Sequence, residues 1–133
     1  MVPWIQNVSM ADVRKGDHYN PGINATLIQI VDPDMEFPVP DFDFGESNIY
    51  QFKFLDIEEV GPNSIKQDDA EKIVQILHTS LDEGRNVVVH CVAGVSRSAA
   101  IVEIGILMGF RDAGEYRCPN KLVLRMLSEL ITQ

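Results

Sequence analysis

Apolar residues along this chain recur with two periods, one typical of strands and one typical of helices. The strand pattern, rich in β-branched and aromatic residues, occurs in four segments. We expect these strands at residues 2–8, 25–31, 49–55 and 87–90. In the third segment Tyr50, Phe52 and Phe54 alternate with polar residues, which indicates one better-buried face. The β-branched run at 87–89 instead predicts a central strand that is buried on both faces.

Helical spacing of apolar residues occurs in three later segments. The first has its apolar positions at 70–81, follows a predicted capping box of Ser64 and Gln67, and is stopped by Gly84. The second, 96–108, is apolar all round, so we expect a helix buried in the body of the fold. The third is amphipathic and is predicted to open at Pro119, a residue favoured in a first helical turn.

Two polar segments connect these elements. Residues 15–24 contain glycine and predict a simple connection. Residues 32–47 contain three prolines and six acidic side chains and predict a long, solvated surface loop. Three aromatic residues are expected to pin this loop to the body of the protein: Phe37, Phe42 and Phe44. The acidity of the loop also leaves open a selection of basic substrates.

The alternation of strands and helices favours an α/β fold. We expect a central, mostly parallel sheet of four to five strands with helices on both faces. The chain has 133 residues, which fits a single domain spanning 1–133. In such sheets ligands bind at the carboxyl ends of the strands, and Cys91 directly follows the predicted strand at 87–90.

The charge of the chain narrows the classes of partner. Its formal net charge is −9, so we expect neither nucleic acid nor an anionic membrane as a general partner. No apolar stretch has the length of a membrane span, and no secretory leader is recognisable. Cys91 and Cys118 are therefore expected to be free thiols in a reducing compartment, the cytoplasm. No spacing of His and Cys resembles a metal site, and we expect no cofactor. The oligomeric state has no signature in the sequence.

The segment between the last predicted strand and the buried helix has the composition of an anion-binding turn. Backbone N–H groups converge in such a turn, and Gly94 permits the backbone angles that this convergence requires. The helix adds its positive N-terminal end, and Arg97 adds a planar fork for two phosphate oxygens. The expected phosphate-binding residues are Val92, Ala93, Gly94, Val95, Ser96 and Arg97.

Cys91 lies in the same positive field. That field favours the thiolate, so the thiol pKa is expected well below its usual value of about 8.5 and no histidine base is needed. Ser98 is expected to donate a hydrogen bond to the sulfur and to ease its departure from a phosphoenzyme. His90 is expected to support the loop by hydrogen bonding to the backbone.

These residues form a continuous motif. The order His90-Cys91-x5-Arg97-Ser98, with Ala93-Gly94 inside it, resembles the phosphate loop of the cysteine-dependent protein tyrosine phosphatase superfamily. The form Ala-Gly-x-Ser-Arg-Ser is similar to that of the dual-specificity branch. The resemblance runs in order over residues 25–130, although the 109–118 segment is short for this family. It implies the family's fold and phosphomonoester hydrolysis through a phosphocysteine intermediate, chiefly on phosphotyrosine proteins, with phosphoserine and phosphothreonine as further targets.

The resemblance also implies a general acid, an Asp that follows a strand well before the cysteine. Such a residue protonates the leaving oxygen and then activates water. Asp56, at the end of the 49–55 strand, is our choice, with Glu58 and Glu59 as alternatives. Asn120 is expected either to hold the phosphate loop or to cap the last helix, and Cys118 to be a packed side chain or a redox partner of Cys91.

Two other functions use the same motif. One is hydrolysis of phosphoinositides or of RNA 5′-phosphates, and the other is phosphoprotein binding without turnover. The loop has no Lys or further Arg between Cys91 and Arg97, and the chain is acidic, which disfavours highly charged polyanions. The presence of Cys91, Arg97 and a candidate acid disfavours a purely binding module.

Overall fold

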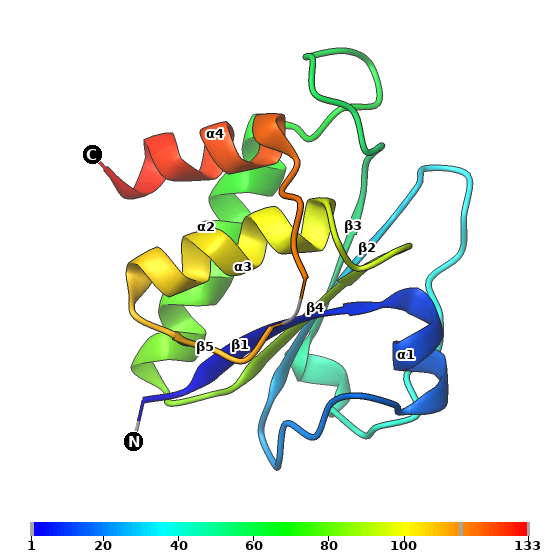
Figure 1. The fold of residues 1–133 in the computed structure, drawn as a ribbon, viewed down its shortest axis with the longest axis vertical. Coiled ribbons are helices and arrows are strands. Elements are labelled where there is room, and N and C mark those ends of the chain that lie inside the picture. The colour runs from blue at the N-terminus through cyan, green and yellow to red at the C-terminus, as the bar shows by residue number, and fades with distance from the viewer. Residues whose placement is uncertain (1, 115, 133) are drawn as a thin grey trace.

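A parallel β-sheet runs through the middle of the computed structural model, which describes residues 2–114 and 116–132 (Figure 1). Within these residues five strands pair in the order β3-β2-β4-β1-β5, and each neighbouring pair is parallel. The strands are β1 (Trp4–Ser9), β2 (Thr26–Val31), β3 (Ile49–Lys53), β4 (Val87–Cys91) and β5 (Arg111–Asp112). The predicted α/β class and parallel sheet are therefore confirmed.

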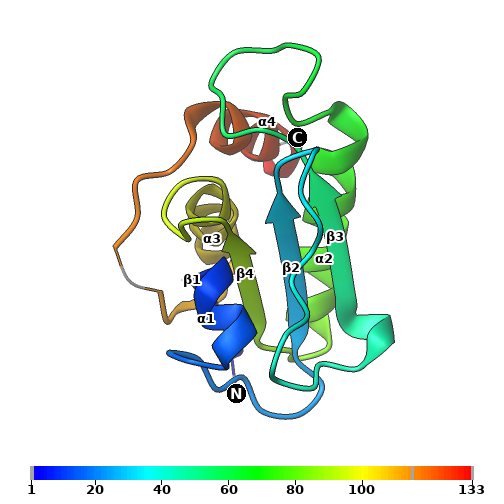
Figure 2. The same ribbon diagram turned by 90° about the vertical axis from the view of Figure 1, so that its right-hand side faces the viewer.

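The two faces of the sheet are covered unequally. The helices are α1 (Met10–Lys15), α2 (Gln67–Asp82), α3 (Arg97–Met108) and α4 (Lys121–Ile131), with a short 3₁₀ helix at Glu46–Asn48. Figures 1 and 2 show α2, α3 and α4 on one side of the sheet and α1 on the other. The expected helices on both faces are present, but the second face has only a six-residue helix. The long loop after β2 covers much of the remainder.

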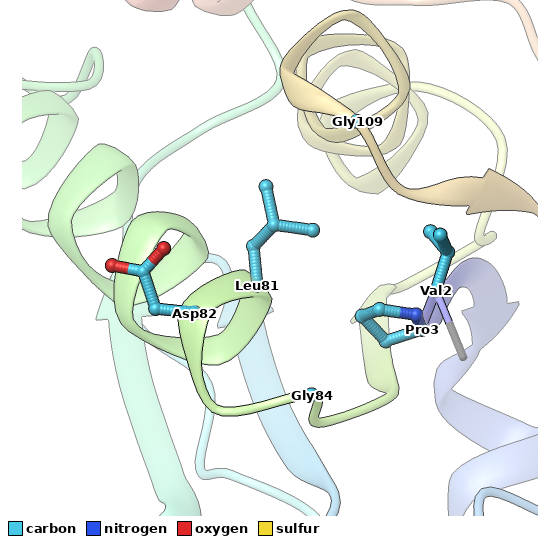
Figure 3. Close-up of a pocket in the computed structure, with 6 residues that line it drawn as sticks. All are labelled: Val2, Pro3, Leu81, Asp82, Gly84 and Gly109. Carbon is cyan, nitrogen blue, oxygen red and sulfur yellow. The ribbon is translucent and has the colours of Figure 1, made fainter.

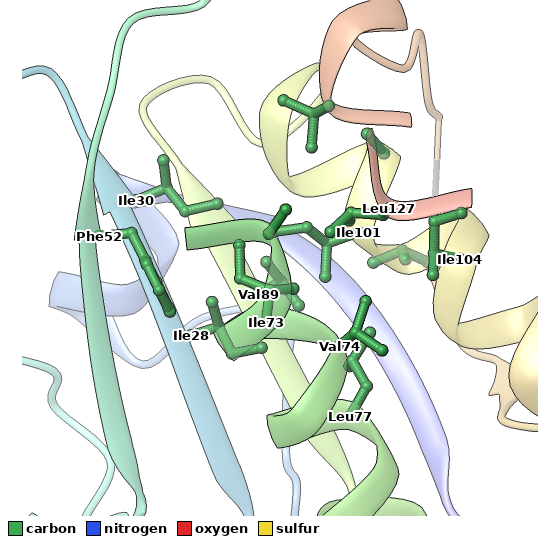
Figure 4. Close-up of a cluster of buried hydrophobic side chains, with 14 of the residues drawn as sticks. Ile28, Ile30, Phe52, Ile73, Val74, Leu77, Val89, Ile101, Ile104 and Leu127 are labelled. Carbon is green, nitrogen blue, oxygen red and sulfur yellow. The ribbon is translucent and has the colours of Figure 1, made fainter. Parts of the chain in front are cut away.

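The larger core lies between the sheet and α2, α3 and α4. Ile28 and Val89 from the sheet, Ile73 from α2, Ile101 from α3 and Leu127 from α4 meet there (Figure 4). Helix α3 is apolar all round because the sheet covers one side of it and other helices cover much of the rest. Because α3 is buried, its packing fixes the position of its first residue, Arg97, at the carboxyl edge of the sheet.

The second core explains how the acidic loop is held. Phe44 is buried together with Val13 of α1 and Leu27 of β2. Its ring stacks on Tyr19 with the centroids 6.1 Å apart, and Phe42 meets it edge-on at 5.1 Å. Phe42 and Phe44 therefore pin the loop as predicted, and they bury apolar surface where other α/β proteins place a helix.

Several local features differ from the sequence predictions, and one of them is β5, which was not predicted. Helix α1 was missed, because six residues capped by Ser9 are too short to show helical periodicity. The capping box of Ser64 and Gln67 was wrong. Helix α2 follows Lys66, whose N–H donates to the Asp69 carboxylate, while Ser64 closes a turn with Gly61. The last helix begins after Pro119, with Asn120 as its N-cap.

The carboxyl ends of the strands gather the residues of the candidate site. The β4 strand ends at Cys91, β2 leads into Asp32, and β3 leads toward Asp56. No helix in the described part of the chain is both long and apolar enough to cross a membrane.

Candidate active site

The turn between β4 and α3 is pressed against the end of β1. Gly94 has a φ of +81°, and a Cβ there would lie 2.5 Å from the backbone carbon of Val8. The Asn7 side chain donates to the Gly94 carbonyl at 2.7 Å, and the Met10 N–H donates to the Val92 carbonyl at 3.1 Å. Glycine is therefore needed at this position for two reasons, the positive φ and the close approach of the loop to the backbone of Val8. These contacts fix the loop in place.

Cys91 is buried at the base of this loop. Its Sγ lies 3.2 Å from the Ser98 hydroxyl and accepts from the Gly94 N–H at 3.3 Å. Burial raises the pKa of the Cys91 thiol, but the Ser98 hydroxyl and loop N–H groups lower it by more. These N–H groups belong to Ser98, Ser96 and Gly94. The pKa therefore lies below the ordinary cysteine value, which favours the thiolate.

His90 is fully buried next to Cys91. Its Nδ1 lies 3.1 Å from the Cys91 carbonyl oxygen. That oxygen only accepts, so Nδ1 carries the proton and donates. Burial lowers the pKa of His90 to about 4, and the nearby charges of Arg14 and Arg97 add to this effect. The imidazole is therefore neutral near pH 7 and holds the backbone of the loop.

Arg97 places a positive charge in the same space. It is 4% exposed, and its Nη1 donates to the Asp32 carboxylate and to the Phe54 carbonyl, each at 2.7 Å. These two bonds use both protons of Nη1. The Nε–H is buried and has no partner among the described residues. The Nε–Nη2 edge of the guanidinium has the geometry for two oxygens of a phosphate.

Asp32 is a site residue that the sequence did not indicate. We assigned it to a solvated loop, whereas its carboxylate pairs with Arg97 Nη1 at 2.7 Å and is one-third exposed. The available signal was its position directly after a buried strand. Recognising it also required knowing that β2 lies next to β4 in the sheet.

Asp56 is the one of the three candidate acids that contacts the phosphate loop. Its Oδ1 accepts from the Ser96 hydroxyl and from the Asn120 side chain, each at 2.7 Å. Glu58 instead accepts from the Lys121 N–H at 2.7 Å, at the start of α4. Glu59 is exposed in the loop between β3 and α2.

Asn120 performs both of the functions considered from the sequence. Its side-chain oxygen accepts from the Val123 N–H and caps α4, while its side-chain nitrogen reaches Asp56 and the Ile57 carbonyl. Its backbone N–H also donates to the Ser96 carbonyl at 3.1 Å. The predicted packing of Cys118 was wrong: this thiol is free and exposed, and only its backbone N–H meets the loop, at Val95.

A hollow lies at the end of the sheet opposite to Cys91. It has a volume of about 510 Å³ and opens beside the starts of β1 and β4 (Figure 3). Its lining residues are Val2, Pro3, Leu81, Asp82, Gly84 and Gly109. None of these side chains is a nucleophile or a cation, so the hollow has no part in the chemistry of Cys91. No group of three or more metal-ligating side chains occurs in the described ranges 2–114 and 116–132.

Sequence comparison links the chain to known phosphatases. Over 90 residues, 68% of the chain, it is 31% identical to the tyrosine-protein phosphatase MSG5 of Saccharomyces cerevisiae. Over this stretch the chain is related in sequence to a tyrosine-protein phosphatase. This relationship confirms the resemblance first seen in the Cys91 motif. The matched stretch spans 17% of the length of the yeast phosphatase, and no family model matches the chain.

Comparison with solved structures indicates a tyrosine phosphatase-like fold. A human tyrosine phosphatase-like serine/threonine/tyrosine-interacting protein superposes over 95% of this chain and 89% of its own, with a TM-score of 0.60 and 21% identity. A tyrosine phosphatase of Orf virus superposes over 80% of this chain and 61% of its own, with a TM-score of 0.48 and 20% identity. The parallel sheet and its helices are therefore tyrosine phosphatase-like.

The fit of Gly94 against β1 can be tested with a matched pair of glycines. Gly94→Ala combines a positive φ with a backbone clash, so we expect it to lower the free energy of unfolding by about 2–4 kcal/mol. Gly22→Ala has nearly the same φ, +78°, and open space around it, so about 1 kcal/mol is expected. Urea unfolding measures both. Equal losses would show that the loop does not depend on its contact with β1.

The lowered pKa of Cys91 predicts how its alkylation depends on pH. In a Cys118→Ser background the rate of reaction with iodoacetamide should rise through a midpoint below that of an ordinary cysteine. Ser98→Ala removes a hydrogen bond to the thiolate, so the midpoint should move to higher pH. Ser128→Ala, in α4, is the control and should leave it in place. An unmoved midpoint in Ser98→Ala would contradict the role given to the hydroxyl.

Proposed function

We propose that this chain is a cysteine-dependent phosphomonoester hydrolase that acts through a phosphocysteine intermediate. One observation carries the proposal. A nucleophile with a lowered pKa, the backbone N–H groups of a tight loop, and the unpartnered Nε of a buried Arg97 belong to one short segment. This combination suits a tetrahedral dianion beside a thiolate. The substrate we favour is a phosphotyrosine protein, with phosphoserine and phosphothreonine as further targets.

The reaction begins with the Cys91 thiolate. Its sulfur attacks phosphorus, the S–P bond forms, and the bond from phosphorus to the ester oxygen breaks. The N–H groups of residues 92–97 and the free edge of Arg97 bind the equatorial oxygens, where negative charge develops. In the second step a water oxygen attacks phosphorus and the S–P bond breaks. Cys91 then leaves as a thiolate, stabilised by the Ser98 hydroxyl.

Asp56 supplies and recovers the proton. Its Oδ1 already accepts two hydrogen bonds, from Ser96 and Asn120, so the transferable proton belongs on Oδ2. In the first step this proton moves to the leaving oxygen. In the second step the carboxylate takes a proton from the attacking water, which restores the starting state. The hydrogen bonds to Oδ1 hold the acid against the phosphate loop in both steps.

The same mechanism applies to other phosphate esters. Phosphoinositides and RNA 5′-phosphates are the alternative substrates, but residues 92–96 include no cation and the net charge is −9. A binding module without turnover is a further alternative, and the contact of Asp56 with Ser96 weighs against it. A reducing compartment, the cytoplasm, would keep the Cys91 thiolate active.

Hydrolysis of p-nitrophenyl phosphate tests the proposal. We expect turnover that persists in the presence of a chelator and stops with vanadate, an anion of similar shape to the transition state. Cys91→Ser should abolish turnover, because the hydroxyl lacks the nucleophilicity of the thiolate. Cys118→Ser, the matched change at the exposed thiol, should keep full activity. Turnover by Cys91→Ser would exclude this mechanism.

The role of Asp56 predicts a dependence on the leaving group. Asp56→Asn should reduce kcat/KM for phenyl phosphate, which reports the step that expels the leaving group, by about 10²–10⁴-fold, because phenoxide leaves slowly without a proton. The loss for p-nitrophenyl phosphate should be much smaller, since its anion is a better leaving group. Glu59→Gln, the neighbouring exposed carboxylate, is the control. If Glu59→Gln shows the selective loss and Asp56→Asn does not, the assignment of the acid is wrong.

A further inference from the structure

A second hollow adjoins the phosphate loop and has no part in the mechanism above. It has a volume of about 240 Å³ and lies between the loop, the end of β1 and the segment that leads to α4. The side chains and backbone that matter here belong to Asn7, Ser9, Asp12, Ala93, Val95 and Tyr116. Residues 93–95 form one of its walls, so anything bound in it lies directly beside a phosphate group held by the loop.

One wall of this hollow is a carboxylate. The Asp12 side chain is one-quarter exposed, and its Oδ1 lies 2.9 Å from His18 Nδ1. Burial raises the pKa of Asp12, but hydrogen bonds from His18 and Ser9 lower it by more, so the pKa lies below its ordinary value. The carboxylate is therefore ionised near pH 7. It can accept from a cation that enters the hollow.

An aromatic residue, Tyr116, also lines the hollow. Tyr116 is 73% exposed, so most of its surface is open to a ligand. Its backbone is not loose: the Tyr116 carbonyl accepts from the Asn7 side chain, and the next residue, Arg117, pairs with Asp112 and Glu103. The backbone of Tyr116 is thus fixed beside the hollow while the residue stays exposed, which suits contact with a ligand.

Asn7 connects the hollow to the loop that follows Cys91. The same Asn7 amide group that meets Tyr116 donates to the Gly94 carbonyl at 2.7 Å. Since Gly94 also packs on the backbone of Val8 and Ser9, the distance between the hollow and the phosphate site is fixed. A substrate that binds in the hollow and in the phosphate site at once would therefore be held in a single position along the protein surface.

We propose that this hollow is a subsite for a Lys or Arg side chain that flanks the phosphorylated residue of a protein substrate. The inference rests on the proposed function and defines its substrate class. A carboxylate and an aromatic ring that line the same hollow can bind an ammonium or guanidinium group through an ion pair and a cation–π contact. An acidic side chain would be repelled by Asp12, and an apolar one would displace water from that carboxylate without offering a charge in return.

The charge of the whole molecule favours the same substrates. A phosphate dianion approaching a chain of net charge −9 is repelled at long range. Basic residues beside the phosphate reduce this repulsion before contact and then enter the subsite. The preference for substrates with Lys or Arg beside the phosphate should therefore weaken at high salt, since screening reduces both the long-range repulsion and the ion pair in the subsite.

Matched phosphotyrosine peptides test the subsite. At each flanking position in turn, one peptide carries Lys and its partner carries norleucine, which has the same length without the charge. We expect at least one position at which Lys raises kcat/KM about three- to tenfold. Asp12→Asn and Tyr116→Leu should each bring this ratio closer to one. Asp82→Asn makes the same change of net charge at the opposite end of the sheet, and should leave the ratio unchanged.

The outcomes separate the subsite from the catalytic proposal. A ratio near one at every position, or a ratio that survives both Asp12→Asn and Tyr116→Leu, overturns the subsite while leaving phosphatase activity intact. If the wild-type chain hydrolyses no aryl phosphate, the catalytic proposal fails instead. Binding of fluorescently labelled forms of the same peptides to Cys91→Ser then measures the Lys preference directly. Equal binding of the Lys and norleucine peptides overturns the subsite. Tyr116→Leu changes an exposed side chain, so it provides the test even if Asp12→Asn does not fold.

Discussion

The guanidinium of Arg97 is a positive charge held almost entirely away from water, and the arrangement of the site depends on how that charge is satisfied. An unpaired buried charge costs several kcal/mol, so partners must be supplied from neighbouring elements. Asp32 after β2 and the Phe54 carbonyl after β3 supply them. The ends of two strands are thereby fixed relative to the loop that follows a third. The edge of Arg97 that these partners leave is the edge that fits a phosphate.

The packing of helix α4 is linked to the candidate site through Asn120. Asn120 caps α4, and its amide group also holds Asp56. Helix α4 packs on α2 and α3, so the core shown in Figure 4 sets the position of the proposed acid. The backbone of Asn120 meets Ser96 as well, which joins acid and phosphate loop at one point. Changes in the core between these helices would therefore affect catalysis without touching a reacting group.

The sequence predicts what is local and misses what is brought together by the topology. The Cys91–Ser98 segment is recognisable because its function depends on consecutive residues, and the strands and the long helices show in their periodicity. Asp32 was missed because its partner, Arg97, is distant in sequence, and strand order is not written in any one segment. Asp56 could be chosen by resemblance, but its contacts with Ser96 and Asn120 could not. The capping error at Ser64 has a local cause: serine also closes turns, and here it does so with Gly61.

The central place of β1 has a consequence for the order in which the chain acquires its reactivity. Ile5 lies opposite Val87, and Trp4 lies opposite Arg111, so β1 has no sheet neighbour until most of the chain has left the ribosome. The β2 and β3 strands can pair earlier, over a shorter separation. Gly94 packs against the backbone of β1 when the loop is closed, and the pKa of Cys91 is lowered by hydrogen bonds within that loop. A nascent chain therefore carries a thiol of ordinary pKa, and the lowered pKa, with the greater sensitivity to oxidation that accompanies it, is reached only when β1 and β4 have paired.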